Sequence, residues 1–320
     1  MAAGMPPAPS CRLESGTPFC RLPGGRGKGT FPDMIALPSC VHLTYPVENY
    51  PVLEIDHSSC KARVALHGAH VMEWQPIGHG PVLYCSPSAV LREGKAIRGG
   101  IPVCWPWFNA HPTDPSKPAH GIARSRFWEL TDCRDEGASV ELRFELKADD
   151  ATRAIWDQEF LATVEVRLGA ELHVSLTSHN LGSEPFQETG ALHTYLSVAE
   201  ISHVEATGLE GASFLETAGG RRDTAVQDGP VRIEGEVDRI YASKETVAVR
   251  DGTRTIFVHK HGSASTVVWN PGSEKASKLG DMPADDYRRF LCVEAANAPG
   301  AEVTVAPGQH HVLRTRIAVS

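Results

Sequence analysis

The sequence lacks long apolar runs, closely spaced cysteines and sustained helical periodicity. No apolar stretch in its 320 residues approaches the roughly 18 residues of a membrane helix, so we expect no membrane span. The eight cysteines are scattered without a C-x-x-C pair, which argues against a zinc knuckle or disulfide scaffold. We therefore expect buried free thiols in a reducing compartment, the cytoplasm.

Basic residues are also fewer than acidic ones. The chain has 31 lysines and arginines against 39 acidic residues, a net charge of −8, which argues against a broad nucleic-acid-binding face. An acidic protein that binds an anionic substrate must gather its cations locally.

Residues 1–33 differ in composition from the remainder. They are rich in Gly, Pro, Ser and Arg and carry few acids, so we expect a disordered leader. A start at Met34 or an organellar transit peptide are alternatives, whereas no apolar core of a secretory signal is present. The folded domain is expected over 34–320.

Alternating apolar and polar residues mark several half-buried strands. Val140–Leu146 is the clearest of them. Leu161–Leu168 and Leu172–Leu176 repeat the alternation around Gly169–Ala170, which predicts a hairpin.

Later segments show the same pattern. Asp251–Gly252 is a two-residue hairpin signal between the runs 246–250 and 255–258. Further strands are expected over 302–305 and 311–319, and a short helical turn over 284–290. Many short strands without intervening helices predict an all-β protein, a large antiparallel β-sandwich of one domain.

The segment Arg98–Phe108 has an unusual composition. Its two glycines, Gly99 and Gly100, allow a ligand to approach the backbone, and two prolines stiffen the chain after them. Trp105, Trp107 and Phe108 offer flat apolar faces that stack on sugar rings. The segment is interpreted as a pocket wall, with a core cluster as the alternative.

Single polar residues stand in apolar surroundings further along the chain. His193 lies in the strand-like run 192–196, where a hydrogen-bonded core histidine is the alternative to a catalyst. Glu294 comes after an apolar run, and burial there would raise the pKa of its carboxyl group. Such isolated carboxylates are candidates for a functional site, with a structural ion pair as the alternative.

Seven segments in this order resemble the glucose-6-phosphate 1-epimerase family of the aldose 1-epimerase superfamily. They are Gly68–His70, Lys95–Pro102, His120–Arg124, His193–Tyr195, Val237–Tyr241, Val267–Pro271 and Cys292–Glu294. The Arg–Gly–Gly–Ile–Pro and His–Gly–x–Ala–Arg elements are the most specific to this family. The resemblance spans about residues 40–317 and implies a galactose-mutarotase-like β-supersandwich with the sugar in an open cleft.

The resemblance also implies roles for single residues. His193 would be the general acid and Glu294 the general base. The expected substrate-binding residues are Lys95, Arg98, His120, Arg124, Asp238 and Trp269. Among these, His120 would lie near the ring oxygen, Asp238 would bind sugar hydroxyls and Arg98 would bind phosphate. Some relatives carry a second phosphate-binding arginine where this chain has Val82, so Lys95, Arg124 or Arg126 would assist Arg98.

The expected function is therefore an isomerase that interconverts the α and β anomers of a hexose 6-phosphate, glucose 6-phosphate first. Acid/base ring opening requires no cofactor or metal, and we expect a monomer whose partner is the small sugar phosphate. The alternatives are a mutarotase for neutral sugars and a non-catalytic carbohydrate-binding protein. A glycoside hydrolase fits less well, because that chemistry normally uses two carboxylates around one bond.

Overall fold

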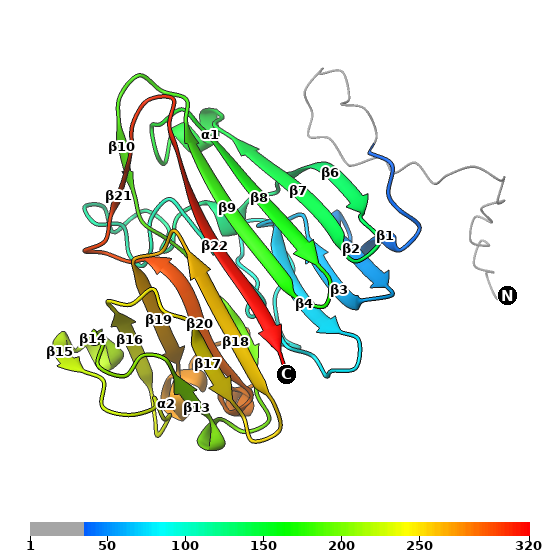
Figure 1. The fold of residues 1–320 in the computed structure, drawn as a ribbon. Coiled ribbons are helices and arrows are strands. Elements are labelled where there is room, and N and C mark those ends of the chain that lie inside the picture. Colours follow the sequence, from blue (N-terminus) through cyan, green and yellow to red (C-terminus); the bar gives the residue numbers. More distant parts are fainter. Residues whose placement is uncertain (1–34) are drawn as a thin grey trace, which may run out of the picture.

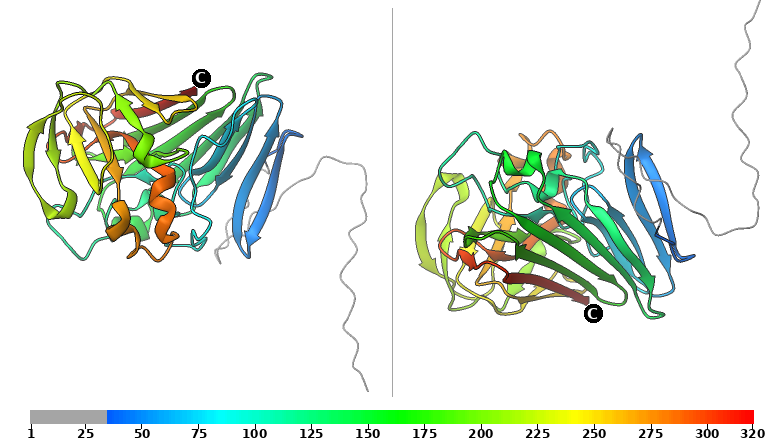
Figure 2. Two further views of the ribbon diagram at one scale, coloured as in Figure 1. Left: turned by 90° about the horizontal axis from the view of Figure 1, so that it is seen from below. Right: turned by 90° about the horizontal axis from the view of Figure 1, so that it is seen from above.

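Antiparallel sheets form almost all of the protein in the computed structural model, which describes residues 35–320. At one end lies a four-stranded sheet in the order β1-β2-β3-β4, drawn in blue, on the opposite side of the molecule from β14 and β15 (Figures 1 and 2). Its strands are β1 (Val41–Val47), β2 (Tyr50–His57), β3 (Cys60–Ala65) and β4 (His70–Pro76). The leader expected over residues 1–33 lies outside the described residues.

An eight-stranded sheet, here called the site sheet, has the order β15-β14-β16-β19-β20-β11-β5, with β12 also paired to β20. Its strands are β5 (Val103–Cys104), β11 (Gly190–Leu192), β12 (Tyr195–Ser197), β14 (Ser213–Glu216), β15 (Asp223–Val226), β16 (Val237–Tyr241), β19 (Ser265–Asn270) and β20 (Phe290–Asn297). β20 is central, because β19 pairs with one side and β11 and β12 with the other.

A second eight-stranded sheet, the outer sheet, has the order β13-β17-β18-β22-β9-β8-β7-β6. Its strands are β6 (Glu129–Asp135), β7 (Val140–Lys147), β8 (Phe160–Leu168), β9 (Leu172–Asn180), β13 (Glu205–Thr207), β17 (Val247–Arg250), β18 (Thr255–His261) and β22 (His310–Val319). Figure 1 shows β7, β8, β9 and β22 side by side in this sheet.

Short elements complete the fold. A two-stranded sheet pairs β10 (Phe186–Glu188) with β21 (Val303–Val305). The helical segments are α1 (Asp150–Arg153), α2 (Gly272–Ala276), η1 (Ala123–Ser125), η2 (Ile201–His203), η3 (Ala218–Gly220) and η4 (Ala284–Arg289). None of the helices within residues 35–320 has the length and apolar character required to cross a membrane.

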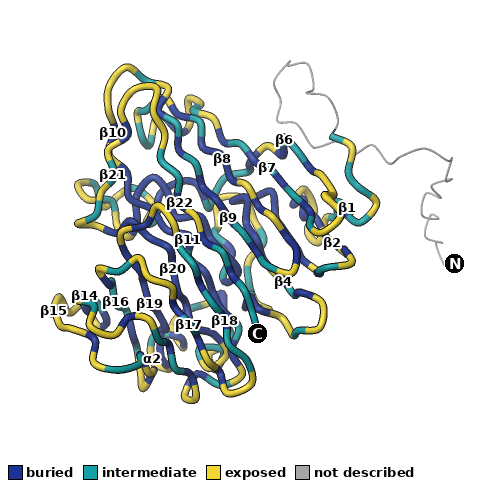
Figure 3. Tube along the Cα trace, viewed as in Figure 1, coloured by how far each residue is buried: buried dark blue, intermediate teal, exposed yellow. Residues whose placement is uncertain are grey.

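The main core contains side chains from both large sheets and from the four-stranded sheet. On β7, Leu142 and Phe144 are buried while Arg143 between them is partly exposed, which is the period of two that a strand produces. They belong to the same apolar cluster as Leu291 and Val293 of β20. Figure 3 shows the resulting alternation of buried positions with partly or fully exposed ones along the outer sheet.

The predicted strands agree with this architecture. Residues 140–146 lie in β7, and β8 and β9 form the expected hairpin around Gly169–Ala170. β17 and β18 also form a hairpin, but the loop has four residues, because Arg250 pairs with Thr255. The side chain of Asp251 accepts hydrogen bonds from the backbone of Thr253 and Arg254 and stabilises this wider turn.

The interpretation of Trp105 as part of a pocket wall is wrong. Its side chain is 1% exposed and packs edge-to-face on Trp156 and Phe160 in the core. Its indole N–H donates to Glu188 Oε2 at 2.6 Å, and Glu188 also accepts from the Ser178 hydroxyl at 2.7 Å. These bonds satisfy a buried carboxylate, so Trp105 joins the layers of the sandwich instead of facing a ligand.

Six cysteines lie within the described residues, and all are free thiols. Four are buried, whereas Cys40 and Cys85 are partly exposed, so the expectation of buried free thiols holds for most of them. Cys11 and Cys20 lie outside the described residues.

Gly100 has the tightest requirement in the loop that carries Arg98. Its φ is +62°, and a Cβ built there would lie 2.2 Å from the carbonyl oxygen of Val71 and 2.7 Å from Nε2 of His70. The loop therefore crosses β4 at a distance that only glycine permits.

We expect Gly100→Ala to lower the free energy of unfolding by about 3 kcal/mol. An alanine there would be strained by the positive φ and would also clash with the backbone of Val71, and both effects destabilise the folded state. Gly252→Ala is the matched control, since Gly252 also has a positive φ but has open space around its Cβ position. It should lose only about 1 kcal/mol. Urea unfolding of both variants measures the difference, and equal losses would contradict this account.

Candidate active site

Glu294 projects from the central strand of the site sheet. Its partner across the ladder is Val267 of β19, and its side chain is 1% exposed. Cys292 and Ala296, two positions away on the same strand, share its face and belong to a second apolar cluster apart from the main core. The backbone that carries this carboxyl group is therefore fixed by strands that are hydrogen-bonded to it on both sides.

His193 lies in the two-residue break between β11 and β12. Its backbone N–H donates to the carbonyl of Pro102 at 3.0 Å, which fixes the break. The imidazole stacks on Tyr195, with ring centroids 4.9 Å apart and an interplanar angle of 13°. In this position Nε2 of His193 lies 3.4 Å from Oε1 of Glu294. The structure thus brings together two residues that are far apart in sequence.

Each member of the pair also presents a polar atom without a partner. Nδ1 of His193 and Oε2 of Glu294 are buried and form no hydrogen bond within the described residues. Leaving such atoms unsatisfied costs free energy, which a bound ligand with hydroxyl groups would recover. The pair is therefore suited to bind and to exchange protons with a polyol.

Burial displaces the ionisation of both groups, in opposite directions. Desolvation, followed by the nearby His120, Arg124 and Arg98, lowers the pKa of His193 well below its usual value. Desolvation and the neighbouring Asp238 raise the pKa of Glu294 well above its usual value. Both effects favour a neutral imidazole beside a neutral carboxylic acid in the ligand-free protein.

Three further predicted residues surround the pair. The ring of His120 lies 6.2 Å from that of His193, and Trp269 lies 5.8 Å from it at 77°. Asp238 pairs with Trp269 in the β16–β19 ladder, and burial raises the pKa of its carboxyl group. Of the predicted aromatic wall, Phe108 reaches this region, because its ring contacts His120 at 5.1 Å.

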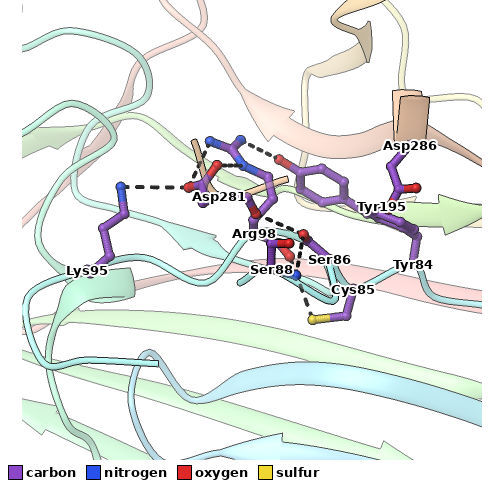
Figure 4. A network of polar contacts seen from close by, with 9 residues as sticks. All are labelled: Tyr84, Cys85, Ser86, Ser88, Lys95, Arg98, Tyr195, Asp281 and Asp286. Carbon is purple, nitrogen blue, oxygen red and sulfur yellow. Dashed lines mark hydrogen bonds and ion pairs between the residues drawn. The ribbon is translucent and has the colours of Figure 1, made fainter. Parts of the chain in front are cut away.

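The predicted phosphate ligands lie in a network that contains a carboxylate. Arg98 Nε donates to Asp281 Oδ1 at 3.0 Å, and Nη2 donates to Oδ2 at 3.4 Å. Nη1 of the same guanidinium donates to the hydroxyl of Tyr195 at 3.1 Å. Nζ of Lys95 lies 3.7 Å from Asp281 Oδ2 (Figure 4). Tyr195 therefore contacts Arg98 through its hydroxyl and His193 through its ring face.

The other basic residues differ in their surroundings. Arg124 donates to the carbonyl of Ala119 at 2.9 Å, and its charge acts on both His193 and Glu294. Arg126 is paired at 3.8 Å with Asp149. Val82 is fully buried in the main core.

Sequence reasoning did not assign roles to Tyr195 and Asp281. Tyr195 had a usable signal, because it lies two positions after His193 in the His–Thr–Tyr segment. Asp281 had none, since it lies 183 positions from Arg98 in the chain. No group of three or more potential metal ligands occurs among residues 35–320.

Comparison with known proteins identifies the family to which the chain belongs. A sequence model of aldose 1-epimerases matches residues 51–318. The chain belongs to the aldose 1-epimerase family. Two relatives provisionally named glucose-6-phosphate 1-epimerases, from Salmonella typhimurium and Escherichia coli, are 35% and 34% identical to it. The alignments cover 83% and 85% of this chain and 91% and 92% of the relatives.

Solved structures confirm the galactose-mutarotase-like fold of this aldose 1-epimerase family member. A crystal structure from Salmonella typhimurium, provisionally described as a mutarotase, superposes with a TM-score of 0.84 at 32% identity, covering 90% of this chain and 96% of that one. A galactose mutarotase related enzyme from Lactobacillus acidophilus has a TM-score of 0.66 at 14% identity, covering 83% and 96%. At 14% identity, the similarity to the Lactobacillus acidophilus structure shows a shared fold and nothing about function.

The opposite environments of two histidines give a test of the site's electrostatics. Below its folded pKa a histidine is charged, and the pKa of His193 is lowered, so we expect its ring to stay neutral at pH 6.5. Burial opposes the charge of His311 too, but its bond to Glu188 outweighs this and raises the pKa. His311 should therefore be mostly protonated at pH 6.5. Nitrogen-15 NMR of the imidazole rings measures both, and titration of His193 above pH 6.5 would contradict the assignment.

Proposed function

We propose that the protein interconverts the α and β anomers of a hexose 6-phosphate, glucose 6-phosphate first, with His193 and Glu294 as the acid/base pair. The observation that carries this proposal is the buried contact of 3.4 Å between the two side chains, each with an unsatisfied polar atom. Anomer exchange needs only such a pair, because it moves two protons and forms no covalent bond to the protein.

The proton transfers are set by the two roles. Glu294, as carboxylate, removes the proton of the anomeric hydroxyl while His193, as imidazolium, protonates the ring oxygen. The C1–O5 bond breaks, and the open-chain aldehyde remains beside a neutral His193 and a neutral Glu294. Rotation about C1–C2 presents the other aldehyde face, and the same protons return as the ring closes.

The opposed pKa shifts suit this cycle. The neutral pair that burial favours is the state that accompanies the open-chain sugar, and the charged pair accompanies the ring. An imidazolium of lowered pKa is a strong acid, and a carboxylate of raised pKa is a strong base. Each group is therefore reactive in the form that begins ring opening.

The remaining predicted residues would hold the substrate. We assign Asp238, Trp269 and His120 to the sugar ring, because they lie around the pair. Lys95 and Arg98 are assigned to the 6-phosphate, since a guanidinium offers a fork of donors to phosphate oxygens. Three of the five Arg98 N–H groups are used within the described residues, and two are left for a ligand. The curated relatives provisionally named glucose-6-phosphate 1-epimerases support this substrate.

Glu294→Gln tests the catalytic pair. The substitution keeps the shape of the side chain and removes the base, so we expect exchange of glucose 6-phosphate anomers to fall about 10²- to 10⁴-fold. NMR exchange spectroscopy measures the rate, and circular dichroism checks the fold. Glu200→Gln, an equal change at a surface ion pair with Arg288, should leave the rate unchanged. Full activity of Glu294→Gln would refute its role.

Arg98→Ala tests the phosphate assignment. We expect KM for glucose 6-phosphate to rise at least about tenfold, because a charge-assisted contact is lost, while exchange of free glucose is much less affected. Arg288→Ala is the matched surface control. A preference for free glucose or galactose, unchanged by Arg98→Ala, would instead support a mutarotase for neutral sugars. Saturable sugar binding without exchange would support a non-catalytic binding protein.

The pH profile is determined by the direction of the shifts. In the active state His193 and Glu294 share one proton, and a second proton, which abolishes activity, must bind to His193. Because the pKa of His193 is lowered, the fall of kcat on the acid side should lie below pH 6.5. Loss of the last proton is governed by Glu294, whose pKa is raised, so the alkaline limb should lie well above the usual pKa of a glutamate. Measurements of kcat at saturating substrate check this, and an acid limb above pH 6.5 would contradict it.

A further inference from the structure

The two cations assigned to the phosphate share an anion supplied by the chain itself. Asp281, in the segment between α2 and η4, binds Arg98 through both carboxylate oxygens at 3.0 and 3.4 Å, and Lys95 approaches to 3.7 Å (Figure 4). The carboxylate therefore occupies one side of the anion site before any ligand arrives. Its negative charge faces the same positive groups that a phosphate would use.

Asp281 is held firmly in this position. Its side chain is 9% exposed, and its backbone carbonyl accepts the hydroxyl of Ser86 at 2.8 Å. Ser86 is in turn bonded through its backbone N–H to the carbonyl of Arg98 at 2.9 Å. Burial opposes ionisation of Asp281, but the bonds and charge of Arg98 outweigh it and lower the pKa of the carboxyl group. The residue is thus a fixed, charged part of the site.

The charges of this group explain what such a residue does. Lys95 and Arg98 contribute two positive charges and Asp281 one negative charge, so the three side chains together carry a net charge of +1. A phosphate ester at neutral pH carries about −1.5 to −2. Any anion that enters meets repulsion from Asp281 together with attraction from the cations. The phosphate contacts alone are then weak, and contacts to the sugar must supply the remainder of the binding.

We propose that Asp281 is a specificity-determining residue, a built-in counter-anion that keeps inorganic phosphate from occupying the site. A phosphate attached to a hexose binds, because His193, Asp238 and Trp269 also hold the ring. This inference rests on the proposed function, in which Lys95 and Arg98 bind the 6-phosphate. A purely structural ion pair would have no such consequence, since its loss would weaken binding of every ligand.

Asp281→Asn distinguishes a specificity-determining residue from a purely structural one, because only the first role predicts tighter binding of inorganic phosphate. We expect the variant to bind inorganic phosphate at least about tenfold more tightly than the unmodified protein, because a like charge beside Lys95 and Arg98 is removed. Isothermal titration calorimetry with phosphate measures the affinity. Inhibition of glucose 6-phosphate exchange by phosphate should strengthen in parallel.

Asp286→Asn is the matched control. Asp286 is nearby in the chain and accepts the hydroxyl of Tyr84 at 2.8 Å, but it is not bonded to Lys95 or Arg98. Its phosphate affinity should equal that of the unmodified protein. A second variant, Asp281→Ala, carries the same expectation and serves if the asparagine variant does not fold. Adding Lys95→Met to Asp281→Asn restores the net charge and should reverse most of the gain.

The outcomes separate this inference from the proposed function. Unchanged or weaker phosphate binding in folded Asp281→Asn and Asp281→Ala, with Arg98→Ala still raising KM for glucose 6-phosphate, would overturn the role of Asp281 alone. If Arg98→Ala leaves both KM and phosphate affinity unchanged, the phosphate site itself is refuted. Tighter phosphate binding in the Asp281 variants but not in Asp286→Asn supports the proposal.

Discussion

The site depends on holding an imidazole and a carboxyl group side by side and out of water. Glu294 is on a strand paired on both sides, and His193 is in a break whose backbone is bonded to Pro102. Burial then shifts the two pKa values in opposite directions. The sandwich therefore determines both the distance between the groups and the strength of each as acid or base.

The face of the site sheet that carries the pair differs from the face against the main core. Because side chains alternate along β20, Val293 lies in the main core, whereas Glu294 lies on the opposite face with Cys292 and Ala296 of the second apolar cluster. The stack of His193 on Tyr195, and the bond from Arg98 to the Tyr195 hydroxyl, join the pair of His193 and Glu294 to the positive groups. In the proposed function, reacting carbons and phosphate are thus held by one connected set of side chains.

Local pattern predicted much of the fold, because a period of two is imposed by burial of one strand face. The hairpins around Gly169 and Asp251 are examples, although the second loop is wider than its dipeptide suggested. Trp105 was misinterpreted, since composition does not say which face of the sheet a residue occupies. The contact of Arg98 with Asp281 could not be predicted, because it joins segments far apart in the chain without any local signal.

The position of Glu294 on a doubly paired strand has a mechanical consequence. The backbone that carries Glu294 cannot follow a moving substrate, because displacement of β20 would break hydrogen bonds to β19 and to β11 together. In the proposed reaction the aldehyde must turn over between openings and closings. In that reaction the phosphate holds the sugar, the aldehyde group at C1 is the part that rotates, and the strand that carries Glu294 stays in place.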